Sequence, residues 1–304
     1  MITLSLVTGF LGSGKTTFMR RVAAQHRGRR LVFLVNECSP LDVDGPLLEN
    51  ATDGVVSLPG GSIFCTCLVT EFINTLRGIP ERFGADMPVE GVIIEASGIA
   101  NPKVIERMLR ETQLDEMYAL STIISIVDPG TFRALLESLP NIAAQIEAAD
   151  TVILNKTDAF DEKTLESVEE KILHLNPGVR LVRATYCDVE LDILAVPQYR
   201  ELDGEYAPCA DPDYAQLTAK VTAPLDAAKM SAALAEMKPV IYRIKGFVPG
   251  ASGNLYLDYS ASGLTFEPAD VTQPSHELAI IASGSHYDQA QRFAESLRSG
   301  LYNA

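Results

Sequence analysis

The residues from Gly9 to Thr16 constrain the fold of this chain more than any other segment. They read Gly-Phe-Leu-Gly-Ser-Gly-Lys-Thr and match the pattern G-x-x-x-x-G-K-[ST] in full. A β-branched apolar run at 3–7 precedes them, and a helical pattern begins near Thr16. Glycines in such a loop let backbone N–H groups approach a phosphate closely at a helix N-terminus. The segment therefore predicts a phosphate-binding loop (P-loop) between a first strand and a first helix.

The residue types at this loop and at a second strand end predict separate roles. We expect Lys15 to bridge the β- and γ-phosphates of a nucleoside triphosphate and the Thr16 hydroxyl to ligate Mg²⁺. Glu95 ends an apolar strand that should reach the same sheet edge, so its carboxylate is expected to hold a Mg²⁺-bound water. Gly98 is expected to offer its N–H to the γ-phosphate. Lys15, Glu95 and Gly98 are thus the predicted catalytic residues, and further loop contacts are expected from Gly12, Ser13, Gly14 and Thr17.

Short apolar runs alternate with longer amphipathic stretches over the first 190 residues. The runs lie at 3–7, 31–35, 92–94, 122–127, 151–154 and 180–183. One intervening stretch, from Phe160 to Pro177, carries apolar residues at helical spacing after a suitable N-cap, Asp161. This alternation is typical of a mostly parallel sheet with helices on both faces. We therefore predict an α/β P-loop NTPase domain over residues 1–194.

The remaining residues predict a linker and a second domain. Residues 195–216 hold four Pro and Gly residues among acidic side chains without periodicity, which predicts a linker. Strand-like segments follow at 217–223, 239–248, 254–259 and 277–283, with helical patterns at 225–237 and 285–300. They predict a smaller α+β domain over 217–304. Nothing in its residues marks a catalytic site.

Charge and composition exclude several classes of protein. The 304 residues include 25 basic and 40 acidic side chains, for a net charge of −15. Such a balance argues against a nucleic-acid surface and against binding to an anionic membrane. No apolar run approaches the roughly 18 to 20 residues that span a bilayer, and the start of the chain predicts a strand rather than a signal peptide. The 5 cysteines do not form a disulfide framework, so we expect a cytoplasmic protein.

The tetrapeptide Asn155-Lys-Thr-Asp158 follows the expected strand 151–154, at the edge where open α/β sheets bind ligands. A carboxylate at Asp158 can accept hydrogen bonds from guanine N1–H and from the exocyclic amine. Adenine lacks that amine and carries an acceptor at N1, so it would be rejected. We expect Asn155 to hold the loop and meet the base edge, and the Lys156 stem to cover the ring. The motif predicts GTP rather than ATP.

Together these motifs resemble the CobW-type P-loop GTPases, which are related to the HypB and UreG GTPases, over nearly the whole chain. The resemblance is carried by the P-loop up to Thr17, by Val35-Asn-Glu37, Glu95-Ala-Ser-Gly98, Gln145-Ile-Glu-Ala-Ala-Asp150, Asn155-Lys-Thr-Asp158, Leu175-Asn-Pro177, Asp188-Val-Glu-Leu-Asp192 and Lys245-Gly-Phe-Val248. It implies GTP hydrolysis coupled to delivery of a metal, usually zinc or cobalt, or to handling of a cobalt corrinoid. Ala96 departs from the family, which usually carries a hydroxyl there.

The thiols depart from the family further. The family typically carries C-x-C-C after Gly-Asn-Gly, whereas this chain reads Gly60-Gly-Ser-Ile-Phe-Cys-Thr-Cys67. The resemblance aligns the three family cysteines with Ile63, Cys65 and Thr66, which leaves Cys67 one residue outside the pattern. Two thiolates do not complete a tetrahedral metal site.

We hypothesise that a cysteine in the first switch completes that site. Cys38 follows Glu37 directly, and together with Cys65 and Cys67 these residues would form a nucleotide-dependent site for a transported metal. A redox-sensitive dithiol and a set of small, partly buried hydrophobic residues are the alternatives. Only four histidines are present, so a histidine-rich zinc store is absent from the sequence.

Three functions compete at this point. The first is a slow GTPase switch that acts as a zinc or cobalt chaperone, or as a metallocofactor-insertion factor, for an unidentified client; no arginine finger is identifiable, so turnover should be slow. The second is a nucleotide-gated binding module that loads or reactivates a corrinoid-dependent partner without carrying metal. The third, a small-molecule kinase, needs an acceptor pocket and a base that the sequence does not display.

Overall fold

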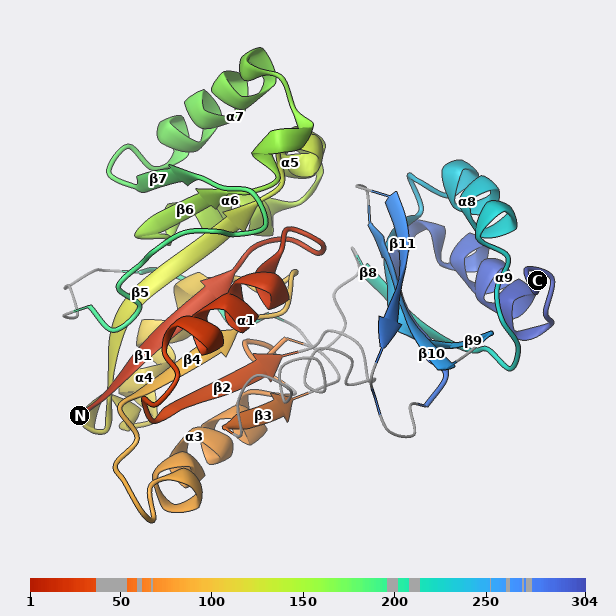
Figure 1. Ribbon diagram of the computed structural model, residues 1–304. Coiled ribbons are helices and arrows are strands. Elements are labelled where there is room, and N and C mark those ends of the chain that lie inside the picture. Colours follow the sequence, from red (N-terminus) through yellow and green to blue (C-terminus); the bar gives the residue numbers. More distant parts are fainter. Residues whose placement is uncertain are drawn as a thin grey trace.

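The computed structural model describes residues 1–36, 54–58, 62–66, 68–195, 202–207, 214–251, 253–260, 263–269, 271 and 275–304. Over these ranges the chain forms two bodies, each built around its own sheet (Figure 1). Three residues of the hypothesised site for a transported metal, Glu37, Cys38 and Cys67, lie outside the described ranges. No helix in the described ranges is long and apolar enough to cross a membrane.

The N-terminal sheet is parallel throughout. Its strands are β1 (Ile2–Thr8), β2 (Leu31–Asn36), β3 (Val55–Leu58), β4 (Gly91–Glu95), β5 (Tyr118–Val127), β6 (Thr151–Leu154) and β7 (Arg180–Arg183), in the order β3-β2-β4-β1-β5-β6-β7. Every apolar run expected to form a strand in this half does so, and β3 is an addition. The α/β prediction with a mostly parallel sheet is therefore confirmed.

Helices cover both faces of this sheet, as its central strands, buried on both faces, require. On one face, α1 (Lys15–Gln25) packs with Phe18 and Met19 against Val7 and Ile93, beside the segment 184–194. The other face is covered by α3 (Val69–Phe83), α4 (Ile105–Glu111), α5 (Pro129–Ser138), α6 (Pro140–Glu147) and α7 (Glu162–Leu175). Single 3₁₀ turns lie at Pro102–Val104, Leu114–Glu116, Thr157–Ala159 and Gly284–His286.

The C-terminal body is a smaller α+β unit, as predicted. Its antiparallel strands are β8 (Tyr214–Lys220), β9 (Ile241–Gly250), β10 (Gly253–Ser260), β11 (Gly263–Ala269) and β12 (Glu277–Ser283), in the order β11-β10-β9-β12-β8. Helices α8 (Ala227–Glu236) and α9 (Tyr287–Arg298) cover one face. β11 was not expected, and β8 begins within the segment expected to be a linker.

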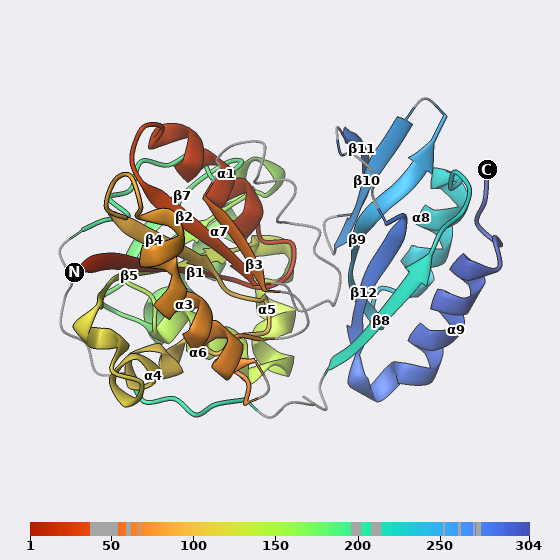
Figure 2. The same cartoon turned by 90° about the horizontal axis from the view of Figure 1, so that it is seen from below.

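The uncovered face of this second sheet is turned toward the N-terminal body. In Figures 1 and 2 the helices α8 and α9 lie on the far side of the sheet, and the P-loop at the end of β1 faces the near side. Aromatic packing joins the two bodies, because the ring centroids of Phe10 in the P-loop and Tyr242 in β9 are 6.1 Å apart. Within the C-terminal sheet, the ring centroid of Tyr242 is in turn 6.1 Å from that of Tyr214 of β8. The P-loop is thus packed between the two sheets.

Candidate nucleotide site

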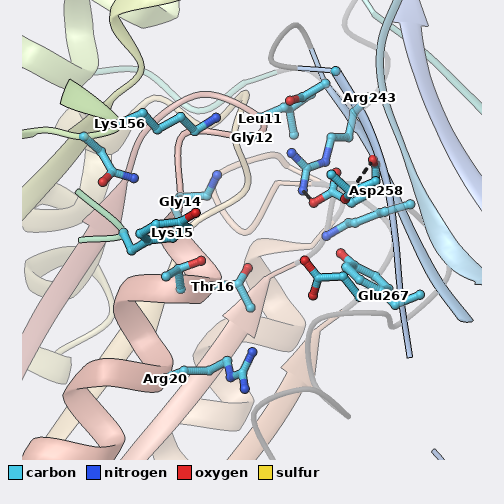
Figure 3. A pocket seen from close by; sticks show the side chains of 18 of the residues that line it. Leu11, Gly12, Gly14, Lys15, Thr16, Arg20, Lys156, Arg243, Asp258 and Glu267 are labelled. Atoms are coloured by element: carbon cyan, nitrogen blue, oxygen red, sulfur yellow. Dashed lines mark hydrogen bonds and ion pairs between the residues drawn. The ribbon is translucent and has the colours of Figure 1, made fainter. Parts of the chain in front are cut away.

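A cavity of about 620 Å³ opens at the carboxyl edge of the parallel sheet, where β1, β4 and β6 end (Figure 3). The N-terminal body lines it with Leu11, Gly12, Gly14, Lys15, Thr16, Thr17, Arg20, Glu95, Asn155, Lys156, Asp158, Ala159 and Tyr186. The C-terminal sheet lines it with residues that include Arg243, Lys245, Tyr256, Asp258, Ser260, Thr265 and Glu267. Most of the residues that the sequence assigned to the nucleotide therefore meet in one place, whereas Ser13 and Gly98 do not line the cavity.

The P-loop backbone forms a tight cradle. Gly12 and Gly14 have φ angles of 81° and 117°, in the left-handed region that favours glycine. A Cβ at Gly14 would also lie 2.5 Å from the Asn155 amide nitrogen, so any side chain there would collide with its neighbour. Lys15 Nζ donates to the carbonyl oxygens of Gly9 at 2.9 Å and Phe10 at 3.2 Å. The ammonium group is held at the loop, within reach of a phosphate bound in the cradle.

Two oxygen donors lie side by side at the junction of the P-loop and β4. Thr16 Oγ1 donates to Glu95 Oε1 at 3.3 Å, and Glu95 is buried. Hydroxyl and carboxylate oxygens are the ligands that Mg²⁺ prefers, together with water and phosphate. The two side chains therefore fit Mg²⁺, which Thr16 would hold directly and Glu95 through a bound water. The roles assigned to these two residues remain predictions.

Asn155 joins the loops that border the site. Its Nδ2 donates to the Ser13 carbonyl at 2.9 Å, and its Oδ1 accepts from the Cys187 N–H at 2.8 Å. Through these two hydrogen bonds Asn155 holds the loops together, as expected from the sequence. Its contact with a base edge remains a prediction. Asp158 is exposed on the cavity wall.

Lys156 is fixed by an ion pair. Its Nζ lies 2.7 Å from Asp128 Oδ2, and the other Asp128 oxygen caps α5 by accepting from the Gly130 N–H at 2.9 Å. Asp128 thus has a structural role, since it pairs with Lys156 and caps α5. The backbone of Lys156 has a φ of 59°, and the 3₁₀ turn Thr157–Ala159, which contains Asp158, follows directly.

Asn36 connects the nucleotide site to the loop that carries Cys65. Its Oδ1 accepts from the N–H groups of Ile63 at 3.0 Å and Ser97 at 3.1 Å, and its Nδ2 donates to the Leu58 carbonyl at 3.0 Å. Ser97 directly precedes Gly98, the residue expected to contact the γ-phosphate. One buried side chain therefore ties the end of β4 to the cysteine loop.

The described thiols do not form a metal site by themselves. Cys65 is buried, and nowhere in the described ranges do three or more His, Cys, Asp or Glu side chains gather as metal ligands. Cys187 is buried against the P-loop, with its Sγ 3.5 Å from the Gly14 carbonyl oxygen. Burial raises the pKa of the Cys187 thiol to about 12, so it stays protonated at neutral pH and is unsuited to bind metal as a thiolate.

The charged face of the C-terminal sheet was missed by sequence reasoning. Arg243 Nη2 lies 2.7 Å from Asp258 Oδ2, and the two side chains are 12% and 28% exposed. Lys245 is only 7% exposed. The spacing of Arg243 and Lys245 could have indicated this charged face, because residues two apart in a strand point to the same side of the sheet. Nothing in the sequence of this domain marks a catalytic site, yet several of its residues line the cavity.

Comparison with known proteins places the chain in a family. The model of the CobW/HypB/UreG nucleotide-binding domain matches residues 3–183. The zinc chaperone CobW of Pseudomonas aeruginosa is 30% identical over 225 residues, which cover 64% of this chain and 59% of that protein. The zinc chaperone YjiA of Escherichia coli is 26% identical over 195 residues, which cover 64% of this chain and 60% of that protein. The matched region thus spans about three fifths of these relatives' length.

Among solved structures, Zn(II)-bound YjiA GTPase from E. coli aligns over 99% of this chain and 98% of that chain, with 20% identity and a TM-score of 0.48. The family match agrees with the resemblance carried by the P-loop and by the Asn155–Asp158 motif. The chain belongs to the CobW/HypB/UreG family, and residues 3–183 are its nucleotide-binding domain.

Proposed function

We propose that this protein binds Mg²⁺·GTP, hydrolyses GTP slowly, and uses the change of nucleotide to control delivery of a metal to a client protein. One observation carries the proposal: Lys15, the Thr16–Glu95 pair and Asp158 line a single cavity. These groups are suited to contact the phosphates, the metal ion and the guanine of one nucleotide. The family of the chain and the GTPases among its relatives support the same reaction.

In the proposed hydrolysis, water attacks the γ-phosphorus, the bond from that phosphorus to the β–γ bridging oxygen breaks, and GDP leaves. Lys15 shifts from the loop carbonyls to the β- and γ-phosphate oxygens and stabilises their charge. Glu95 orients the water ligands of the metal, and the Gly98 N–H reports the presence of the γ-phosphate. Mg²⁺, when bound, neutralises charge on the β- and γ-oxygens.

For the cargo, zinc is the first candidate because the named relatives are zinc chaperones; cobalt is the second. We place the cargo site at Cys38, Cys65 and Cys67, with Glu37. The bonds of Asn36 support a dependence on nucleotide, since they join Ser97 to the loop of Cys65. Delivery to a cytoplasmic client metalloprotein completes the proposal.

An anaerobic titration with Zn²⁺ and Co²⁺, with and without Mg²⁺·GTP, tests the cargo site. Wild type is compared with Cys65→Ser/Cys67→Ser, and Cys187→Ser serves as the matched thiol control. A thiolate-to-Co²⁺ charge-transfer band that is lost in the double variant, kept in Cys187→Ser, and shifted by nucleotide is the expected result.

Lys15→Ala should abolish GTP hydrolysis and weaken nucleotide binding; unchanged turnover would contradict the P-loop assignment.

A second candidate is a nucleotide-gated module that loads or reactivates a corrinoid-dependent partner without carrying metal. It is favoured by one observation: Ile63, at the first family cysteine position, is fully buried, and Thr66 occupies the third. GTP binding without any cysteine-dependent metal binding, together with affinity for a corrinoid protein, would select this alternative.

A further inference from the structure

The C-terminal sheet presents two chemically different faces. On β9 and β10, Ile244 and Leu257 belong to the apolar core beneath α8 and α9. Their neighbours Lys245 and Asp258 point the opposite way and line the nucleotide cavity, because successive side chains of a strand alternate between faces. The second face of the sheet therefore forms a charged wall of the cavity.

A bulge in β9 aims one residue of this wall at the P-loop. In the pairing of β9 with β12, Ile281 lies opposite Arg243 and Ala282 opposite Ile241, so Tyr242 is an extra residue. Ile241 and Ala282 pack in the core with α8 and α9, whereas Tyr242 and Ile281 pack with the apolar cluster that contains Phe10 of the P-loop. Bulges commonly re-aim side chains beside active sites. Here the bulge holds Arg243 next to the point where the two bodies touch.

The guanidinium of Arg243 lies over Gly12. A Cβ added to Gly12 would be 2.6 Å from Arg243 Nη1, and Figure 3 shows this side chain extending from β9 toward the loop. The loop itself has two distinguishable ends. Leu11 contacts Gly98, where a Cβ would lie 2.7 Å from Leu11 N, and Gly14 contacts Asn155 of the guanine motif. Gly12 directly follows Leu11, so Arg243 lies on the Gly98 side of the loop, where we expect the terminal phosphate to bind.

Asp258 fixes the orientation of this arginine. Its Oδ2 accepts from Arg243 Nη2 at 2.7 Å, which leaves Nη1 on the side of Gly12. The carboxylate also compensates a cation that is only 12% exposed. Lys245, which lies opposite Asp258 in the pairing of β9 with β10, adds a second buried cation to the same wall. Two cations on one wall are conspicuous in a chain with a net charge of −15.

We propose that Arg243 is a catalytic arginine supplied in cis: its guanidinium donates hydrogen bonds to the γ-phosphate oxygens and the β–γ bridging oxygen as that bond breaks. The inference rests on the proposed GTP hydrolysis. Such a group stabilises charge that develops in the transition state, and arginines in this role raise kcat by about 10³ to 10⁵. The chain then needs no arginine from a partner for basal turnover, and hydrolysis depends on the contact between its two bodies.

The test compares Arg243→Ala with Arg243→Lys and with Arg292→Ala, an exposed arginine on α9. Single-turnover GTP hydrolysis, GTP affinity and binding of GDP with aluminium fluoride are measured on the full chain. We expect Arg243→Ala to slow hydrolysis by at least about 100-fold, to lose the aluminium fluoride complex and to bind GTP within a few-fold of wild type. Arg243→Lys should lose at least about tenfold, since an ammonium cannot form the same fork.

The outcomes separate the two proposals. If wild type neither hydrolyses GTP nor binds aluminium fluoride, the proposed function fails. If wild type does both and Arg243→Ala matches Arg292→Ala, only the assignment of Arg243 is overturned. Should Arg243→Ala be misfolded by circular dichroism, Arg243→Lys decides, because it keeps a cation for Asp258: unchanged hydrolysis at unchanged GTP affinity overturns the assignment, and slower hydrolysis supports it.

Discussion

Asp158 is the residue on which the choice of base depends. Its carboxylate is exposed in the cavity and can accept two hydrogen bonds from guanine. In Asp158→Asn the amide would set a donor against a guanine donor, so GTP affinity should fall about 100-fold or more. Xanthosine triphosphate should gain affinity, since its C2 carbonyl accepts from the new amide. Competition binding with GTP, ATP and xanthosine triphosphate measures the change; retained discrimination against ATP would show that the base is recognised elsewhere.

Cys187 gives the pH dependence of stability a definite sign. Burial raises its pKa from 9.0 to about 12, so the folded state retains a proton that the unfolded chain releases. The contribution of this thiol to the free energy of unfolding is complete below pH 9 and is lost as the pH rises toward 12. Urea unfolding of wild type and Cys187→Ala between pH 7 and pH 10.5 tests this. The loss above pH 9 should be smaller in the variant, and identical slopes would contradict the prediction.

At the scale of elements, Asn36 is the junction of β2, β3, the cysteine loop and the end of β4. Asn36→Ala removes three buried hydrogen bonds, and unpaired buried groups cost about 1 to 3 kcal/mol each. We expect unfolding free energy to fall by roughly 3 kcal/mol and nucleotide to lose its effect on metal binding. Asn141→Ala, which removes a single bond to Ile99 O, is the matched control and should lose about 1 kcal/mol. Equal losses in the two variants would remove the special role of Asn36.

The elements also show what the sequence could predict. Every strand of the parallel sheet that carries a long apolar run was identified, because burial on both faces leaves a continuous signal. β3 was not predicted because only two of its four residues, Val56 and Leu58, are buried, and they alternate with partly exposed ones. β11 escaped because its exposed residues include Thr265 and Glu267, which line the cavity. Polar residues in a strand resemble a loop in the sequence, because the cavity that they face is not visible there.

At the scale of the whole molecule, the candidate site divides into a predictable and an unpredictable part. Lys15, Thr16 and Asp158 lie in local motifs whose spacing already implies a nucleotide. Arg243 lies in a strand far along the chain, and its position over Gly12 depends on how Tyr242 packs against Phe10. How the two bodies dock is a long-range property, and the local periodicity of apolar residues carries no information about it. Lys245, which lines the cavity between the two bodies, is likewise buried although it carries a charge.

If the C-terminal sheet forms a wall of the nucleotide site, bound nucleotide must stabilise that sheet as well as the P-loop. Hydrogen exchange on the full chain should therefore slow at amides of β9 and β10 when Mg²⁺·GTP is added. At a ligand concentration 100 times Kd, the protection can reach about 100-fold for openings that release the nucleotide. Amides of α9, on the far face of the sheet, serve as the internal comparison and should change less.

In Arg243→Ala, protection of β9 should decrease while protection of the P-loop persists, because the cation that joins the two bodies through the phosphates is gone. Protection confined to the P-loop in wild type would mean that the two sheets stand apart in solution, and the catalytic role of Arg243 would lose its structural basis.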